Sequence, residues 1–121
     1  MQGIEAVLSD VMNRWKAGID AQQPEEVAAV FTTDAIFQGL HPYCVGCQGV
    51  FGYYASQAPG MTVTYSVLET RRLADDLVLG YLSADFSFPD RPTVSVYLGV
   101  VARNENDDWR IAFYEASRLT G

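Results

Sequence analysis

The chain has 121 residues, of which 49% are hydrophobic, and its formal net charge is -7. A chain of this size can bury a core without disulfides or metal ions, so we expect one domain over residues 1–121. The negative charge repels nucleic-acid phosphates and anionic lipid headgroups, which argues against nucleic acid and membrane partners. No apolar stretch approaches the roughly 20 residues of a spanning helix, and the N-terminus lacks the basic start of a secretion signal. We therefore expect a cytoplasmic protein.

A long amphipathic helix is predicted at the N-terminus. Apolar residues recur there at spacings of three and four, which places them on one helical face. These residues are Ile4, Val7, Leu8, Val11, Met12, Trp15 and Ile19. Because the remaining surface is largely polar, we expect this helix to cover a sheet.

A second helix should begin at Pro24, because proline suits the first turn and the following Glu25 and Glu26 favour the positive end of the helix dipole. Its buried side is expected to consist of Val27, Ala28, Val30 and Phe31. Residues 32–34 should end this helix, and residues 35–37 should form a short strand.

The later part of the chain is rich in β-branched and aromatic residues and is broken by three turn-forming segments. Four strands are predicted, at 62–73, 77–88, 93–103 and 109–118. Tight turns join antiparallel neighbours, so the strands should form a meander. Helices followed by hairpins indicate an α+β fold, in which a curved antiparallel sheet wraps around the N-terminal helices and encloses an apolar pocket.

Two segments carry a resemblance to a known superfamily. Residues 23–37, QPEEVAAVFTTDAIF, and the closing strand 109–117, WRIAFYEAS, resemble the ketosteroid isomerases, the SnoaL-type polyketide cyclases and nuclear transport factor 2. The resemblance covers nearly the whole chain and implies the cystatin-like α+β roll, a cone with an apolar pocket. That superfamily hosts several chemistries, so the resemblance indicates the fold more than the activity.

Comparison with the ketosteroid isomerases implies that their catalytic set is missing. Their oxyanion tyrosine falls on Trp15, their general-base aspartate on Gly39 and their protonated aspartate on Gly99. Only the pocket tyrosine of the third helix has a match, Tyr54. Because that chemistry needs a carboxylate base opposite an oxyanion hole, we do not expect a standard ketosteroid isomerase.

Aromatic side chains are the expected ligand contacts, because they suit a flat or cyclic apolar molecule. The resemblance implies that Trp15, Tyr54, Phe86, Phe88 and Tyr114 face the hollow, and we predict that these residues and Tyr97 bind the ligand. Strand alternation turns Asp85 and Glu115 away from this aromatic face, although a face assignment wrong by one residue would make them an acid/base pair. A second apolar row predicts a homodimer through the outer face of the sheet: Leu77, Leu79, Tyr81, Trp109, Ile111 and Phe113.

The segment from His41 to Cys47 allows several interpretations. His41 is the only histidine, and histidine titrates near neutrality, so it is a candidate proton shuttle together with Tyr54. Cys44 and Cys47 could bind zinc with His41 or form a redox pair, but a structural zinc site normally needs four ligands, and the thiols could equally pack in a loop. We expect neither a metal nor a cofactor.

Glycine also recurs at spacing three across the expected third helix, at Gly46, Gly49 and Gly52. These glycines weaken a helix and could make it a mobile lid, or they could allow close packing of the backbone. The leading functional prediction is a pocket protein that binds a small hydrophobic molecule. The alternatives are a cofactor-free isomerase, cyclase or dehydratase that uses Tyr54 or His41, and a non-catalytic interaction module.

Overall fold

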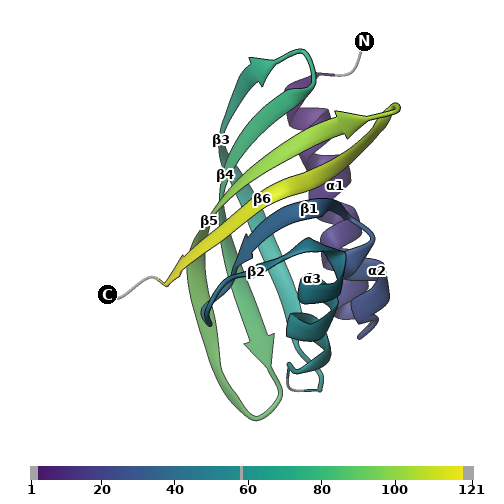
Figure 1. Ribbon diagram of the computed structural model, residues 1–121. Helices are drawn as coiled ribbons and strands as arrows, with labels where there is room; N and C mark the ends of the chain where they lie inside the picture. Colours follow the sequence, from purple (N-terminus) through teal and green to yellow (C-terminus); the bar gives the residue numbers. More distant parts are fainter. Residues whose placement is uncertain (1–2, 58, 119–121) are drawn as a thin grey trace.

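The computed structural model describes residues 3–57 and 59–118, in which three helices lie against a curved sheet (Figure 1). The helices are α1 (Ile4–Asp20), α2 (Pro24–Ala28) and α3 (Gly46–Ala55). The strands are β1 (Phe31–Gln38), β2 (Cys44–Val45), β3 (Thr62–Ala74), β4 (Leu77–Phe88), β5 (Arg91–Glu105) and β6 (Asp108–Arg118).

The sheet has the strand order β2-β1-β6-β5-β4-β3 and confirms the predicted α+β class. Strands β3 to β6 form the expected antiparallel meander. One pair differs, because β1 runs parallel to β6. No tight turn joins these two strands, which are far apart in the chain, so the hairpin rule that fixes the meander does not constrain their direction.

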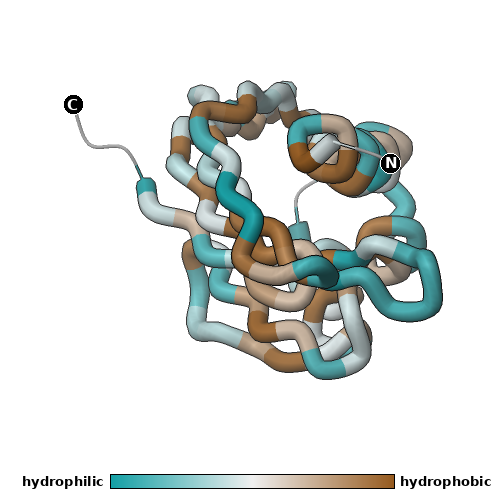
Figure 2. Tube along the Cα trace, turned by 90° about the horizontal axis from the view of Figure 1, so that it is seen from above, coloured by the Kyte–Doolittle hydropathy of each residue, from teal (hydrophilic) through white to brown (hydrophobic). Residues whose placement is uncertain are grey.

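The core lies between α1 and the concave face of the sheet. Seen from above, the strands curve toward the helices, and hydrophobic segments recur along both (Figure 2). The predicted face of α1 is buried, with Val7, Leu8, Val11, Met12, Trp15 and Ile19 all within the core. It meets strand residues that alternate along β4 and β5: Val78, Leu82, Ala84, Val96, Leu98 and Val100. Packing of this apolar stripe stabilises the arrangement through the area that it removes from water.

The boundary between α2 and β1 lies earlier than predicted. The helix ends at Ala28, and β1 already begins at Phe31, so residues 32–34 belong to a strand rather than to a helix end. The pairing with β6 explains this difference: the Ile111 amide donates to the Val30 carbonyl at 2.8 Å, and Phe31 pairs with Ile111. Tertiary pairing thus overrides the local turn preference of this segment.

A bulge in β6 settles which of its side chains face the core. Val101 pairs with Phe113 and Ala102 pairs with Ile111, so Ala112 is the extra residue. Ile111 and Tyr114 are therefore both buried, although strict alternation would place them on opposite faces. Ile111 belongs to the core and not to the outer apolar row in which the sequence pattern places it.

The convex outer face carries a stacked pair of tyrosines. The rings of Tyr81 and Tyr97 lie 5.4 Å apart, and both side chains are exposed. Asp85 and Glu115 are exposed too, and Asp85 accepts a hydrogen bond from Ser95 on the neighbouring strand. These carboxylates point away from the core as expected. The homodimer through this face stays a prediction.

Among the helices in the described ranges, none combines the length and the apolar content needed to cross a bilayer.

Candidate functional site

A pocket of about 210 Å³ lies between the sheet and α3; we call it the sheet pocket. Its apolar wall is formed by side chains from β4, β5 and β6: Phe86, Phe88, Val94, Val96 and Ala116. The cross-strand pair of Phe86 and Val94 fixes the register of this wall. Strand alternation therefore delivers a continuous hydrophobic surface to one end of the sheet.

Two buried phenols form the deep side of the sheet pocket. Tyr54 on α3 and Tyr114 on β6 both line it, and both are almost fully buried. The Trp15 indole donates a hydrogen bond to the Tyr54 hydroxyl at 3.0 Å. Phe37 stacks on Tyr114 with ring centroids 4.5 Å apart. The phenols are thus held by an aromatic cluster rather than by mobile loops.

Burial determines the protonation of these phenols. It raises the pKa of Tyr54 far above the ordinary value, although the hydrogen bond from Trp15 acts in the opposite direction. Burial likewise raises the pKa of Tyr114 well above its usual range. Both groups are therefore neutral at physiological pH. Tyr54 accepts from Trp15 and keeps its own O–H to donate, so it can hydrogen bond a ligand but cannot serve as a phenolate base.

His41 lies at the mouth of the sheet pocket, next to Tyr53. The two rings are 5.9 Å apart, and both line the pocket. Tyr53 also explains Gly39: a Cβ atom at Gly39 would lie 2.5 Å from the Tyr53 hydroxyl. The Tyr53 ring therefore occupies the space in which the isomerase resemblance would place a carboxylate base.

The other aligned glycine lies elsewhere. Gly99 pairs with Tyr81 and Glu115 on the outer side of the sheet, and a Cβ there would meet open space. The neighbouring Leu98 and Val100 face the core. Gly99 therefore lies outside the pocket, because its side of β5 faces away from it.

The cysteine segment packs against β1. Both thiols are free; the Cys47 thiol donates to the Phe31 carbonyl at 3.3 Å, and burial raises the pKa of the Cys44 thiol. A Cβ at Gly49 would lie 2.8 Å from the Cys44 Cβ, and Gly46 has a φ of 81° with the Thr33 carbonyl beside it. These two glycines thus serve close packing. Within residues 3–57 and 59–118, no three His, Cys, Asp or Glu side chains group as metal ligands do.

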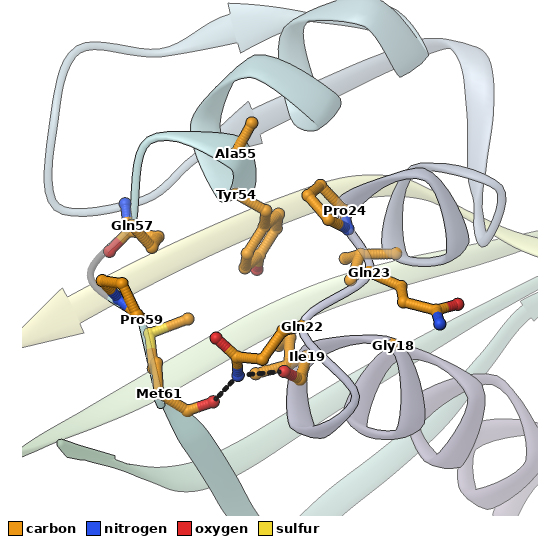
Figure 3. Close-up of a pocket in the computed structure, with 11 residues that line it drawn as sticks. Gly18, Ile19, Gln22, Gln23, Pro24, Tyr54, Ala55, Gln57, Pro59 and Met61 are labelled. Carbon is orange, nitrogen blue, oxygen red and sulfur yellow. Dashed lines mark hydrogen bonds between the residues drawn. The ribbon is translucent and has the colours of Figure 1, made fainter. Parts of the chain in front are cut away.

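A second cavity, the helix cleft, opens between the end of α1, the start of α2 and the turn before β3 (Figure 3). It measures about 250 Å³ and shares Tyr54, Gln57 and Met61 with the sheet pocket. The Gln22 side-chain amide donates to the carbonyls of Ile19 and Met61, at 2.9 and 2.6 Å, and so ties α1 to this turn. Sequence reasoning missed both Gln22 and Met61, because neither belongs to an aromatic or periodic pattern.

The structure brings together most of the predicted site residues. Five of them line the sheet pocket: His41, Tyr54, Phe86, Phe88 and Tyr114. Trp15 is not among the described lining residues; it lies behind Tyr54 and supports it. Tyr97 lies on the outer face against Tyr81, because its neighbours Val96 and Leu98 occupy the inner face.

Comparison with known proteins shows the fold. No family model and no curated protein matches this sequence. One similar solved structure is a domain of unknown function with a cystatin-like fold from Nostoc punctiforme. The match covers 100% of this chain and 80% of that chain, with a TM-score of 0.86 at 15% identity. A ketosteroid isomerase-like protein from Erwinia carotovora atroseptica matches 96% of both chains, with a TM-score of 0.81 at 16% identity.

A third similar structure is a scytalone dehydratase-like protein from Novosphingobium aromaticivorans, with a TM-score of 0.74 at 14% identity over 94% of this chain and 83% of that one. The predicted resemblance to the SnoaL-like, ketosteroid isomerase-like and nuclear transport factor 2-like superfamily is thereby confirmed for the fold. This chain has the cystatin-like α+β fold. At these identities the likeness says nothing of a shared activity.

Proposed function

We propose that this protein binds a small hydrophobic, ring-containing molecule in the sheet pocket. The observation that carries the proposal is the combination of an apolar strand wall with two neutral, buried phenols at its deep side. Sites for small molecules are commonly concave and apolar, with a few convergent polar groups that fix orientation. Here Phe86 and Phe88 would contact the ring, and Tyr54 would donate a hydrogen bond to a ligand oxygen.

Filling the pocket is the direct test. Ala116 on β6 lines the sheet pocket, so Ala116→Leu should reduce the affinity for naphthamide, a neutral bicyclic aromatic probe, by about tenfold or more, because the added side chain competes for the same volume. Titration calorimetry measures this change.

The matched control is Ser117→Leu. Ser117 is the next residue of the same strand, is exposed and faces the other way, so this variant should bind naphthamide like the parent protein. Equal loss in both variants, or no saturable binding by the parent protein, would count against the proposed site.

A cofactor-free isomerase, cyclase or dehydratase is the second candidate function, and one observation favours it. His41 and Tyr54 line the same pocket, so an imidazole, the side chain that most often transfers protons in enzymes, shares it with a buried hydrogen-bond donor. In such a reaction His41 would move the proton, and Tyr54 would stabilise the charge developing on a ligand oxygen.

The exposed position of His41 makes this alternative testable. If the protein turns over a ring compound that bears a carbonyl or hydroxyl group, His41→Ala should lower the rate roughly a hundredfold. Binding of naphthamide should stay unchanged in this variant, because His41 is exposed at the rim. Unaltered turnover in His41→Ala would remove histidine from the mechanism.

A further inference from the structure

Two arginines lie at the mouth of the sheet pocket. Arg91 begins β5 and Arg118 ends β6, and both line the pocket. Both also border a shallow hollow on the adjoining part of β5, so the two side chains lie over the same corner of the molecule. The described lining of the sheet pocket contains no aspartate or glutamate. A basic pocket mouth stands out on a chain whose net charge is -7.

The strands themselves place these arginines. On β6, Tyr114, Ala116 and Arg118 follow one another at every second position, so Arg118 continues the inner row toward the pocket mouth. On β5, Arg91 pairs with Phe88, and its guanidinium carbon lies 5.2 Å from the centre of the Phe88 ring. This cation–π contact holds Arg91 against the ring at the rim.

The charge of the pocket mouth is poorly neutralised by the protein. Among the described residues, six of the eight basic side chains pair with a carboxylate: Arg14, Lys16, Arg71, Arg91, Arg103 and Arg110. Within the described part of the chain, Arg118 has no carboxylate partner in an ion pair. The partner of Arg91 is its neighbour Asp90, at 3.3 Å, and both side chains are more than half exposed. Such exposed pairs contribute little and leave the guanidinium available.

We propose that the natural ligand is an apolar ring compound that carries a carboxylate, with the ring in the sheet pocket and the carboxylate at Arg91 and Arg118. This inference rests on the proposed function and names its ligand class. Guanidinium groups present planar sets of N–H donors that match the two oxygens of a carboxylate. The pocket thus changes along its depth, from neutral phenols through an aromatic and aliphatic wall to a cationic mouth, which matches a molecule that is anionic at one end only.

The test compares naphthoate with naphthamide, which share the bicyclic ring and differ in charge. At low ionic strength the parent protein should bind naphthoate about tenfold more tightly than naphthamide, and added salt should narrow the difference. The double variant Arg91→Gln, Arg118→Gln should lose this preference and keep its affinity for naphthamide. Arg72→Gln is the matched control, because Arg72 is exposed on β3, outside the lining of the pocket, and has no carboxylate partner among the described ion pairs.

Each outcome decides between the two proposals. Preference for naphthoate that is lost in the double variant and kept in Arg72→Gln supports the carboxylate inference. Equal binding of the two probes, or a preference that survives in the double variant, overturns the inference and leaves the hydrophobic pocket standing. Failure of both probes to bind would overturn the proposed function itself.

Discussion

Trp15→Ala is expected to lower the free energy of unfolding by about 3–5 kcal/mol, the range observed when large aromatic side chains are removed from well-packed cores. Trp15 is fully buried, and its ring contacts those of Tyr65, Phe86 and Tyr114. The substitution also leaves the Tyr54 hydroxyl without its indole donor. Urea denaturation followed by circular dichroism measures the loss.

The chain offers a matched control in its only other tryptophan, Trp109, which is half-buried at the start of β6. Trp109→Ala should cost clearly less, because a smaller area returns to water. A third variant, Trp15→Phe, keeps a ring and removes the N–H group. The part of its loss in free energy of unfolding that the smaller side-chain volume does not explain measures the hydrogen bond to Tyr54, at about 1 kcal/mol. Equal destabilisation by Trp15→Ala and Trp109→Ala would contradict the central position assigned to Trp15.

Alkaline pH is expected to unfold the protein through Tyr54 and Tyr114. Burial raises the pKa of both phenols in the folded state above the ordinary value of about 10, which applies to the unfolded chain. Between the pKa of these phenols in the unfolded chain and their higher pKa in the folded protein, the folded state binds more protons than the unfolded state. The free energy of unfolding therefore falls as the pH rises through this range. The contribution is fully present below a pH of about 10 and is lost progressively above it.

Tyrosinate absorbance and circular dichroism, recorded together during alkaline titration, test this prediction. Subtracting the titration curves of Tyr54→Phe and Tyr114→Phe from that of the parent protein gives the tyrosinate absorbance of Tyr54 and Tyr114. This absorbance should increase only as the helical circular dichroism signal is lost. Tyr43→Phe serves as the control, because that ring is 65% exposed and its loss should leave the unfolding transition in place. Ionisation of Tyr54 with the fold intact would contradict the closed aromatic cluster.

Local periodicity explains which features could be predicted from the sequence. The buried face of α1 follows from spacings within one helix. Phe86, Phe88 and Tyr114 follow from the superfamily resemblance, because their strands carry apolar residues on both faces. Tyr97 and Gly99 both lie on the outer face of β5. Both faces of this strand carry apolar residues, so alternation alone does not say which one meets the core, and the isomerase comparison that points to Gly99 does not settle it either. The bulge at Ala112 could not be predicted either, because no local residue pattern indicates where β6 changes the face that it buries.

The pocket mouth could not be predicted, for a different reason. Arg91 and Arg118 each resemble an ordinary surface charge near a strand end, and only the pairing of β4, β5 and β6 brings them to one corner. The role of Tyr53 is similar. Its ring fills the space beside Gly39 because α3 packs against β1, a contact between elements that are joined through the short β2 hairpin.

The sheet pocket and the helix cleft share three lining residues, Tyr54, Gln57 and Met61, and these form a partition between the two cavities. Methionine is unbranched and adopts alternative rotamers at low cost, so the thickness of this partition depends on one adaptable thioether. A rearrangement of Met61 would join the two chambers without breaking a strand or a helix. If the sheet pocket binds the proposed ring compound, a side-chain torsion would set the upper limit on its length, and the same fold would then accept ligands longer than a bicyclic ring.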